Sequence, residues 1–105
     1  MQAKKRFGQN FLTDNKLLED LANLINVAPN DKLLEIGPGK GDLTKKLINV
    51  CYSYFGIELD KDLLVILRNK FQKNKNAFID GDILKLRPSE IYASNEFRVV
   101  GNIPY

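Results

Sequence analysis

The sequence predicts an α/β fold with a mostly parallel sheet, because segments of strand character alternate with segments of helical period along its 105 residues. A glycine-rich loop joins the first predicted strand to a helix, an arrangement typical of open parallel sheets that bind a ligand. The last predicted strand, 97–103, is apolar on both faces, as a central parallel strand should be. A chain of this length forms one domain at most.

Residues 1–13 are predicted to form a basic arm, because they include Lys4, Lys5 and Arg6 and show no helical period. A helix is predicted after this arm, with Asp14 as its N-cap and its end near Pro29. Its apolar residues recur every three or four positions, as one face of a helix requires: Leu17, Leu18, Leu21, Leu24 and Ile25.

A short buried strand is predicted over 32–36, and it leads into a glycine loop at 37–41. Residues 42–50 carry leucine and isoleucine at helical spacing and predict a second helix. The second strand, 52–59, is aromatic and β-branched.

Asp60 is predicted to cap the helix after the second strand. The apolar residues of that helix are Leu63, Leu64, Ile66, Leu67 and Phe71. A third strand is predicted over 76–80, a short helix from 87 to 91, and the fourth strand over 97–103.

The composition excludes several kinds of site. Histidine is absent and Cys51 is the one cysteine, which excludes an internal disulfide, a histidine-based triad and a zinc site rich in cysteine or histidine, and no metal is predicted. Cys51 is predicted to be a small core residue. No apolar run approaches the ~20 residues of a membrane span, and we expect a cytoplasmic protein. The net charge of +3 permits a polyanionic partner without requiring one.

The glycine loop is the first candidate ligand site. Gly37, Gly39 and Gly41 let the backbone adopt positive φ and approach a ligand closely. Glu58 ends the second predicted strand, at the spacing where an acid binds ribose hydroxyls in nucleotide-type sites. The alternative is a tight turn followed by a surface acid.

The position after this loop discriminates between ligands. A dinucleotide fingerprint would place a third glycine where Asp42 stands, and a carboxylate there would repel a pyrophosphate. S-adenosylmethionine carries a sulfonium and an ammonium and no phosphate, so it suits an acidic, glycine-lined cleft. An oxidoreductase on a dinucleotide fold is the disfavoured alternative.

Asp82 and Ile83 follow the third predicted strand, which we expect beside the second. The Asp82 carboxylate is predicted to accept a hydrogen bond from an adenine amine, with Ile83 packed on the adenine face. Alternatively, Asp82 caps a turn after Gly81.

The motif Asn102-Ile103-Pro104-Tyr105 follows the fourth predicted strand. An amide carbonyl, a proline that removes a backbone donor and an aromatic ring are suited to grip a planar ring that bears an amine. A plain turn is the alternative for so short a pattern.

The chain resembles the ribosomal RNA adenine dimethyltransferase family through five segments in the same order and spacing. They are Lys5-Arg6-Phe7-Gly8-Gln9-Asn10-Phe11-Leu12, Glu35-Ile36-Gly37-Pro38-Gly39-Lys40-Gly41, Glu58-Leu59-Asp60, Gly81-Asp82-Ile83-Leu84 and Gly101-Asn102-Ile103-Pro104-Tyr105. The resemblance implies a Rossmann-like methyltransferase fold. It also implies that the S-adenosylmethionine site is lined by Asn10, Leu12, Gly37, Glu58, Asp82 and Asn102. We predict five further residues in the same site: Gln9, Gly39, Gly41, Leu59 and Ile83.

The same resemblance implies N6,N6-dimethylation of two adjacent adenosines in a loop near the 3′ end of small-subunit rRNA, linked to ribosome biogenesis. Asn102 and the three residues after it would be catalytic: Ile103, Pro104 and Tyr105. The expected partner is the small-subunit rRNA or the pre-30S subunit, and the protein is expected to be monomeric. Lys4, Lys5 and Arg6 are predicted to contact rRNA phosphates, with a solvated charge run as the alternative.

Two other functions stay open. The sister branch of Erm-type methyltransferases modifies large-subunit rRNA and shares nearly all of these motifs; Lys40 and Ile103 favour that branch, whereas the opening Arg6–Leu12 segment favours the small-subunit enzymes. The second alternative is a non-catalytic RNA-binding factor of ribosome assembly.

Full members of the family continue well beyond 105 residues. We therefore expect 14–105 to be the N-terminal portion of a methyltransferase catalytic domain. The rest of the sheet and a helical C-terminal domain would lie outside this chain.

Overall fold

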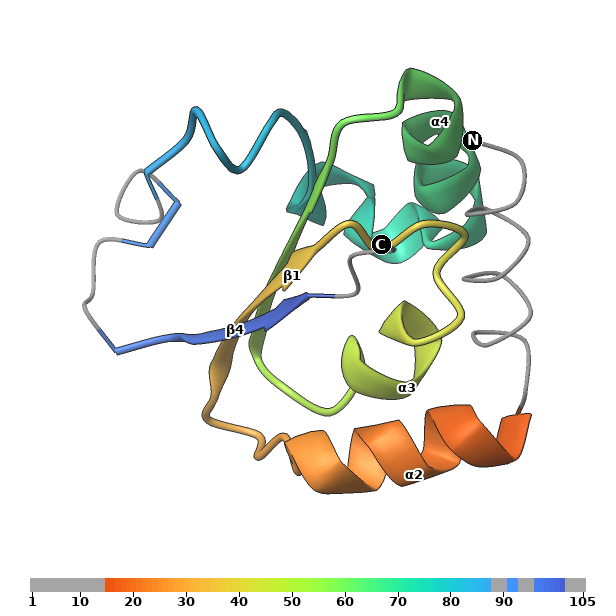
Figure 1. Ribbon diagram of the computed structural model, residues 1–105, viewed down its shortest axis with the longest axis vertical. Helices are drawn as coiled ribbons and strands as arrows, with labels where there is room; N and C mark the ends of the chain where they lie inside the picture. Colours follow the sequence, from red (N-terminus) through yellow and green to blue (C-terminus); the bar gives the residue numbers. More distant parts are fainter. Residues whose placement is uncertain (1–14, 88–90, 93–95, 102–105) are drawn as a thin grey trace.

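The computed structural model describes residues 15–87, 91–92 and 96–101 (Figure 1). Its sheet has four parallel strands in the order β3-β2-β1-β4. The strands are β1 Lys32–Ile36, β2 Ser53–Glu58, β3 Phe78–Asp80 and β4 Arg98–Gly101. This confirms the predicted parallel α/β fold and the predicted neighbourhood of the second and third strands.

The helices are α2 Asn15–Ile25, α3 Thr44–Leu47 and α4 Lys61–Lys70, with a 3-10 segment, η1, at Gln72–Ala77. As predicted, Asp60 caps α4, because its Oδ1 accepts from the N–H groups of Asp62 at 2.9 Å and Leu63 at 3.2 Å. In the described part of the chain, no helix is long and apolar enough to cross a membrane.

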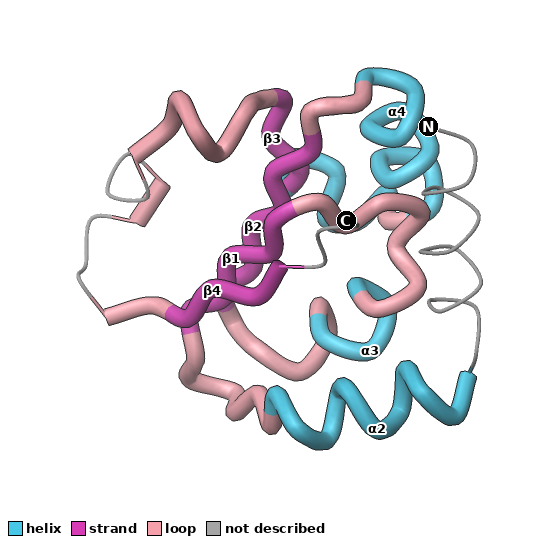
Figure 2. Tube along the Cα trace, viewed as in Figure 1, coloured by secondary structure: helices cyan, strands magenta, loops and turns pink. Residues whose placement is uncertain are grey.

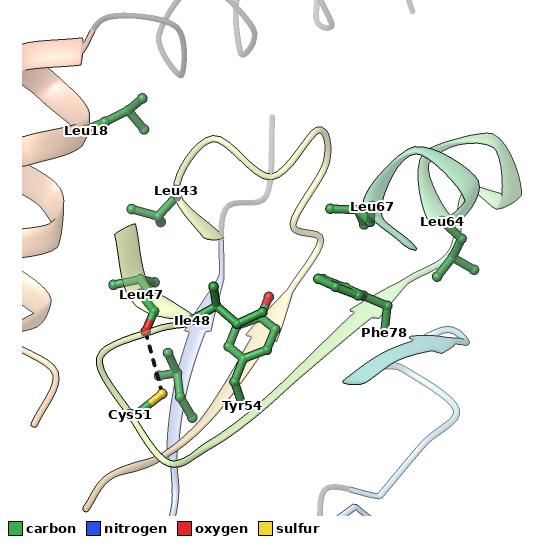
Figure 3. Packing of buried hydrophobic residues seen from close by; sticks show 10 residues of the cluster. Leu18, Leu43, Leu47, Ile48, Cys51, Tyr54, Leu64, Leu67 and Phe78 are labelled. Carbon is green, nitrogen blue, oxygen red and sulfur yellow. Dashed lines mark hydrogen bonds between the residues drawn. The ribbon is translucent and has the colours of Figure 1, made fainter. Parts of the chain in front are cut away.

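One face of the sheet, called here the helical face, is covered by α2, α3 and α4 (Figure 2). Figure 3 shows Leu47 of α3 on the side of Tyr54 of β2 and Leu67 of α4 on the side of Phe78 of β3, with Leu18 of α2 farther from both rings. Cys51 is 8% exposed in this cluster, as predicted for a core residue. The buried cluster is Leu18, Leu33, Leu43, Leu47, Ile48, Cys51, Tyr54, Leu64, Leu67 and Phe78.

The opposite face carries a smaller buried cluster, Leu34, Ile57 and Tyr92. Tyr92 comes from the irregular segment after β3, which Figure 2 shows on the side of the sheet away from the helices. Its hydroxyl donates to Leu33 O at 2.9 Å and accepts from Ser53 Oγ at 3.0 Å. These bonds hold the segment against the sheet.

Several predicted boundaries were wrong. The helix predicted over 42–50 is helical only at Thr44–Leu47, because Gly41 has a φ of 86° and turns replace the helix on either side. The third strand begins at Phe78 and not at 76, because the polar run before it forms the 3-10 segment.

Two residues predicted for buried helix faces are exposed instead, Leu24 at 81% and Ile66 at 43%. Val99 of β4 is 51% exposed at the edge of the described sheet, so the described residues do not cover the fourth strand on both faces. The expected N-cap Asp14, much of the short helix at 87–91 and the end of the fourth strand lie outside the described residues.

Candidate functional site

The ends of neighbouring strands bring the predicted site residues to one edge of the sheet. Glu58 ends β2 and lies in register with Asp80, the last residue of β3. Ile36, the last residue of β1, pairs with Ile57. Because the strands are parallel, the glycine loop, Glu58 and the turn at Asp82 all follow carboxyl ends of adjacent strands (Figure 2). Open α/β sheets bind ligands at this edge.

The glycine loop turns sharply at the end of β1. Gly37, Gly39 and Gly41 have positive φ values of 67°, 64° and 86°, a region that other residues rarely adopt. The Gly41 N–H donates to Pro38 O at 3.0 Å and closes a tight turn. Among the described residues, a Cβ built on Gly39 would meet only Gly37 O, at 4.0 Å. The loop therefore leaves room beside Gly39 for a ligand.

Glu58 holds this loop directly. The residue is 7% exposed, and its Oε1 accepts a hydrogen bond from the Gly39 N–H at 3.0 Å. Its Oε2 accepts from the Asp60 N–H at 3.1 Å, in the turn that starts α4. A carboxylate has about four acceptor positions, so Glu58 can make these bonds and still accept from a ribose hydroxyl. The spacing predicted the acid but not its bond to the loop.

A buried polar cluster that the sequence analysis missed lies next to the loop. Glu35 of β1 is 1% exposed, and its Oε1 accepts from Thr44 Oγ1 at 2.6 Å and from the hydroxyl of Tyr54. Its Oε2 is buried and has no hydrogen-bond partner within the described structure. Burial raises the pKa of Glu35, the two hydroxyl bonds oppose this shift, and the nearby charge of Glu58 adds to it.

The last turn of α4 also contacts the loop. Lys70 Nζ donates to Lys40 O at 2.9 Å and lies 3.7 Å from Asp42 Oδ1. A Cβ on Gly41 would lie 2.6 Å from the Phe71 ring, so only glycine fits there without a shift. The ammonium of Lys70 partly compensates the Asp42 charge, which weakens the predicted repulsion of a phosphate by Asp42 alone.

In the turn after β3, Asp82 caps the turn, which was the alternative to a role in ligand binding. Its Oδ1 accepts from the Leu84 N–H at 3.0 Å, and its backbone carbonyl accepts from the Lys85 N–H at 2.9 Å. The carboxylate retains acceptor positions, so this turn is compatible with an adenine amine at the same group. Ile83 packs against the smaller cluster on the opposite face, and Leu59 is 63% exposed beside Glu58.

The remaining predicted site residues lie outside the described part of the chain: Lys4, Lys5, Arg6, Gln9, Asn10, Leu12, Asn102, Ile103, Pro104 and Tyr105. The last described residue before that final motif is Gly101, which pairs with Ile36 in the sheet. Gly101 therefore lies at the same edge as the glycine loop, one residue before Asn102.

The described groups suit a ligand that carries positive charge. Glu58 ends β2 and Asp82 follows β3 near an open glycine turn, and a third acid, the buried Glu35, lies within β1. Carboxylate acceptors at the edge of the sheet, Glu58 and Asp82, fit S-adenosylmethionine, which has hydroxyls and an amine to donate and a sulfonium and an ammonium to balance negative charge. In the described residues, no three acidic or cysteine side chains are grouped as metal ligands would be.

Comparison with known proteins shows which family the chain matches. Residues 1–105 match the family described as ribosomal RNA adenine dimethylase. The chain is 44% identical to Ribosomal RNA small subunit methyltransferase A of Pseudomonas syringae pv. tomato, covering 99% of this chain and 40% of that protein. It is 40% identical to the protein of the same name from Coxiella burnetii, covering 100% of this chain and 41% of the relative.

Solved structures agree on the fold. The 23S rRNA methyltransferase ErmE has a TM-score of 0.76 at 33% identity, covering 90% of this chain and 38% of that one. A dimethyladenosine transferase from Plasmodium falciparum has a TM-score of 0.65 at 24% identity, covering 86% and 32%. The chain thus spans about 40% of the length of the curated relatives it matches.

Proposed function

The chain belongs to the ribosomal RNA adenine dimethylase family, and from this premise we propose that it carries the S-adenosylmethionine site of an rRNA adenine N6-methyltransferase. The observation that carries the proposal is the bond between Glu58 and the glycine loop, Oε1 to Gly39 N–H at 3.0 Å. This bond sets the ribose-binding acid and the open glycine turn side by side at the carboxyl edge of a parallel sheet.

In this proposal, different described residues bind different parts of the cofactor. Gly37, Gly39 and Gly41 line its amino-acid part, and Glu58 accepts from the ribose hydroxyls. Asp82 accepts from the adenine amine, and the apolar side chains of Leu59 and Ile83 flank the ring. Gln9, Asn10, Leu12 and Asn102 complete the site, as the family resemblance implies.

The methyl acceptor is proposed to be the N6 amine of an adenosine. Its lone pair is delocalised into the ring, so the amine is a poor nucleophile. The Asn102 side-chain oxygen and the Ile103 carbonyl accept both N6 hydrogens, which favours a pyramidal nitrogen with its lone pair free. Pro104 fixes the turn, and Tyr105 stacks on the extruded base, a contact worth roughly 1–3 kcal/mol. The bound cofactor supplies the methyl group.

The substrate we propose is small-subunit rRNA in a pre-30S particle, with two adjacent adenosines each dimethylated. Support comes from the two curated relatives, both named for the small subunit. Lys4, Lys5 and Arg6 are proposed to contact rRNA phosphates, which positions the RNA without reading its sequence. A cytoplasmic location and a monomeric state complete the proposal.

A second candidate substrate is large-subunit rRNA. Lys40 and Ile103 favour it, and the TM-score of 0.76 with ErmE, a 23S rRNA methyltransferase, is compatible with it. The fold of these residues is common to both candidates, so only the RNA can distinguish them.

Methyl transfer to purified ribosomal particles tests both the activity and the substrate. We expect the full-length protein to transfer labelled methyl groups from S-adenosylmethionine to pre-30S particles and not to large-subunit rRNA. Asn102→Ala should lower kcat by about a hundredfold, because the acceptor amine loses its positioning. The matched control is Asn76→Ala, at an exposed position of η1, which should leave kcat unchanged. An Asn102→Ala enzyme within a few-fold of wild type would overturn the proposed mechanism, and methylation of large-subunit rRNA would favour the second candidate.

A further inference from the structure

We propose that Lys70, in the last turn of α4, is a positioning residue that fixes the glycine loop in the shape that binds the cofactor. The inference rests on the proposed function, since it concerns the same loop. The family resemblance implies no role for Lys70.

The contacts of Lys70 connect two segments 30 residues apart. Its Nζ donates to Lys40 O at 2.9 Å and lies 3.7 Å from Asp42 Oδ1. The Lys70 side chain is 36% exposed, and its Nζ lies 5.9 Å from the centre of the Phe71 ring. One ammonium therefore links Lys40 of the loop and Asp42, the residue after the loop, to the end of a helix.

The loop needs such a link because glycines flank the bonded carbonyl. Gly39 and Gly41 stand on either side of Lys40, and glycine tolerates both positive and negative φ. The peptide group between Lys40 and Gly41 is held on one side by the bond from the Gly41 N–H to Pro38 O, at 3.0 Å. Lys70, fixed outside the loop, holds the carbonyl on the other side of the same peptide group and so further limits its rotation. Such preorganisation raises affinity because less order is lost on binding.

The helix that carries Lys70 is itself fixed close to the loop. Leu67 is buried, and both Leu67 and Phe71 lie within 3.2 Å of the position a Cβ on Gly41 would take. From the end of β2, Glu58 holds the Gly39 N–H. Gly39, Lys40 and Gly41 are thus held by Glu58, by Lys70 and by apolar packing respectively.

The test uses variants of Lys70 in the full-length protein. Lys70→Met keeps much of the apolar stem and removes the donor, whereas Lys70→Arg restores a cationic donor. Lys73→Met is the charge-matched control, because Lys73 is exposed in η1. Calorimetric titration with S-adenosylmethionine measures affinity, amide hydrogen exchange at Gly39 and Gly41 measures loop order, and thermal unfolding checks the fold.

For Lys70→Met we expect about a threefold to tenfold loss of affinity, the size expected from one exposed charge-assisted hydrogen bond. Exchange at the two glycine amides should accelerate by about the same factor, because the loop opens more often. The KM for the cofactor should rise while kcat and the KM for RNA stay unchanged. Lys70→Arg should recover most of the affinity, and Lys73→Met should match wild type.

Several results would overturn the proposal. Unchanged cofactor affinity and unchanged exchange in Lys70→Met would show that the loop keeps its shape without this donor. A raised KM for RNA with normal cofactor affinity would make Lys70 a phosphate contact instead. An equal loss of cofactor affinity in Lys70→Met and Lys70→Arg would show that the shape of the side chain, and not its charge or donor, causes the effect. Wild-type protein that fails to bind S-adenosylmethionine would refute the proposed function, a result distinct from failure of Lys70 alone.

Discussion

On the helical face of the sheet, α2, α3 and α4 pack against side chains of the strands, whereas the opposite face is covered, within the described residues, by the irregular segment after β3. The first cluster contains the aromatic rings of Tyr54 and Phe78, in edge contact with centroids 5.8 Å apart. The second depends on Tyr92, whose hydroxyl bonds to the backbone of β1 and to a side chain of β2.

This difference matters for the site because the polar groups that support the glycine loop belong to the helical face. Side chains alternate along a strand, so Glu35 shares its face with Leu33, and Glu58 shares its face with Tyr54. The residues that support the loop therefore lie on the same face as the larger of the two buried clusters. We infer that damage to the helical face will reduce both stability and cofactor affinity, whereas damage to the opposite face, which includes Ile83 but none of the groups bonded to the loop, will reduce mainly stability.

The largest expected effect comes from Phe78→Ala on the helical face. Phe78 is 1% exposed and contacts the rings of Tyr54 and Phe71, both of which lie against the loop or its supports. Removing a buried phenyl ring costs about 3–5 kcal/mol of unfolding free energy. Urea denaturation should show this loss, and calorimetry should show weaker cofactor binding.

The matched control for Phe78→Ala is Phe55→Ala, on the opposite face, where the residue is only partly buried. It should cost less stability and leave cofactor affinity near wild type. A larger loss in Phe55→Ala than in Phe78→Ala would contradict the inferred difference between the faces.

A smaller effect on stability, which depends on pH, is expected from Glu35. Burial raises the pKa of its carboxyl above the ordinary value of 4.5. Well below pH 4.5 the group is protonated in both the folded and the unfolded protein. As pH rises from there, the unfolded chain releases its proton first, so the contribution to stability is lost as pH rises through the folded pKa. Wild type should therefore lose stability relative to Glu35→Gln above pH 4.5, as urea denaturation across pH would measure.

Asp31 provides an internal contrast for this pH prediction. A backbone hydrogen bond from Ala28 and a side-chain hydrogen bond from Arg98 lower the pKa of Asp31. Its contribution to the stability of the folded protein therefore changes with pH in the direction opposite to that of Glu35, and it is lost as pH falls. A parallel pH profile for wild type and Glu35→Gln would mean that Glu35 is not shifted in the folded protein.

Much of the fold was predictable because its signals are local. Asp31 and Gly37, on either side of the short segment 32–36, marked the two ends of β1. Asp60 marked the start of α4 through an N-cap that its own side chain makes. The glycines marked the loop because their positive φ values suit few other residues.

The supports of the loop were not predictable for the opposite reason. Glu35 meets Tyr54 only because β1 and β2 pair in register, and the two residues are 19 positions apart. Lys70 meets Lys40 across 30 positions only after α4 has packed on the sheet. Leu24 fits the helical period yet is 81% exposed. The period predicts which residues share one face of a helix, but it does not predict which other elements will cover that face. Such contacts are properties of the assembled sheet.

The smallest expected effect tests the opposite face through Tyr92→Phe. The substitution keeps the aromatic ring, which stacks on Phe97 and contacts Phe55, both at 5.4 Å between centroids. It removes only the hydroxyl that donates to Leu33 O and accepts from Ser53. The loss should be about 1 kcal/mol of unfolding free energy, the net size of an intramolecular hydrogen bond. Cofactor affinity should not change, because the hydroxyl touches none of the groups that hold the glycine loop. An equal fall in stability and in affinity would mean that the two faces act as one unit, and the separation inferred here would have to be abandoned.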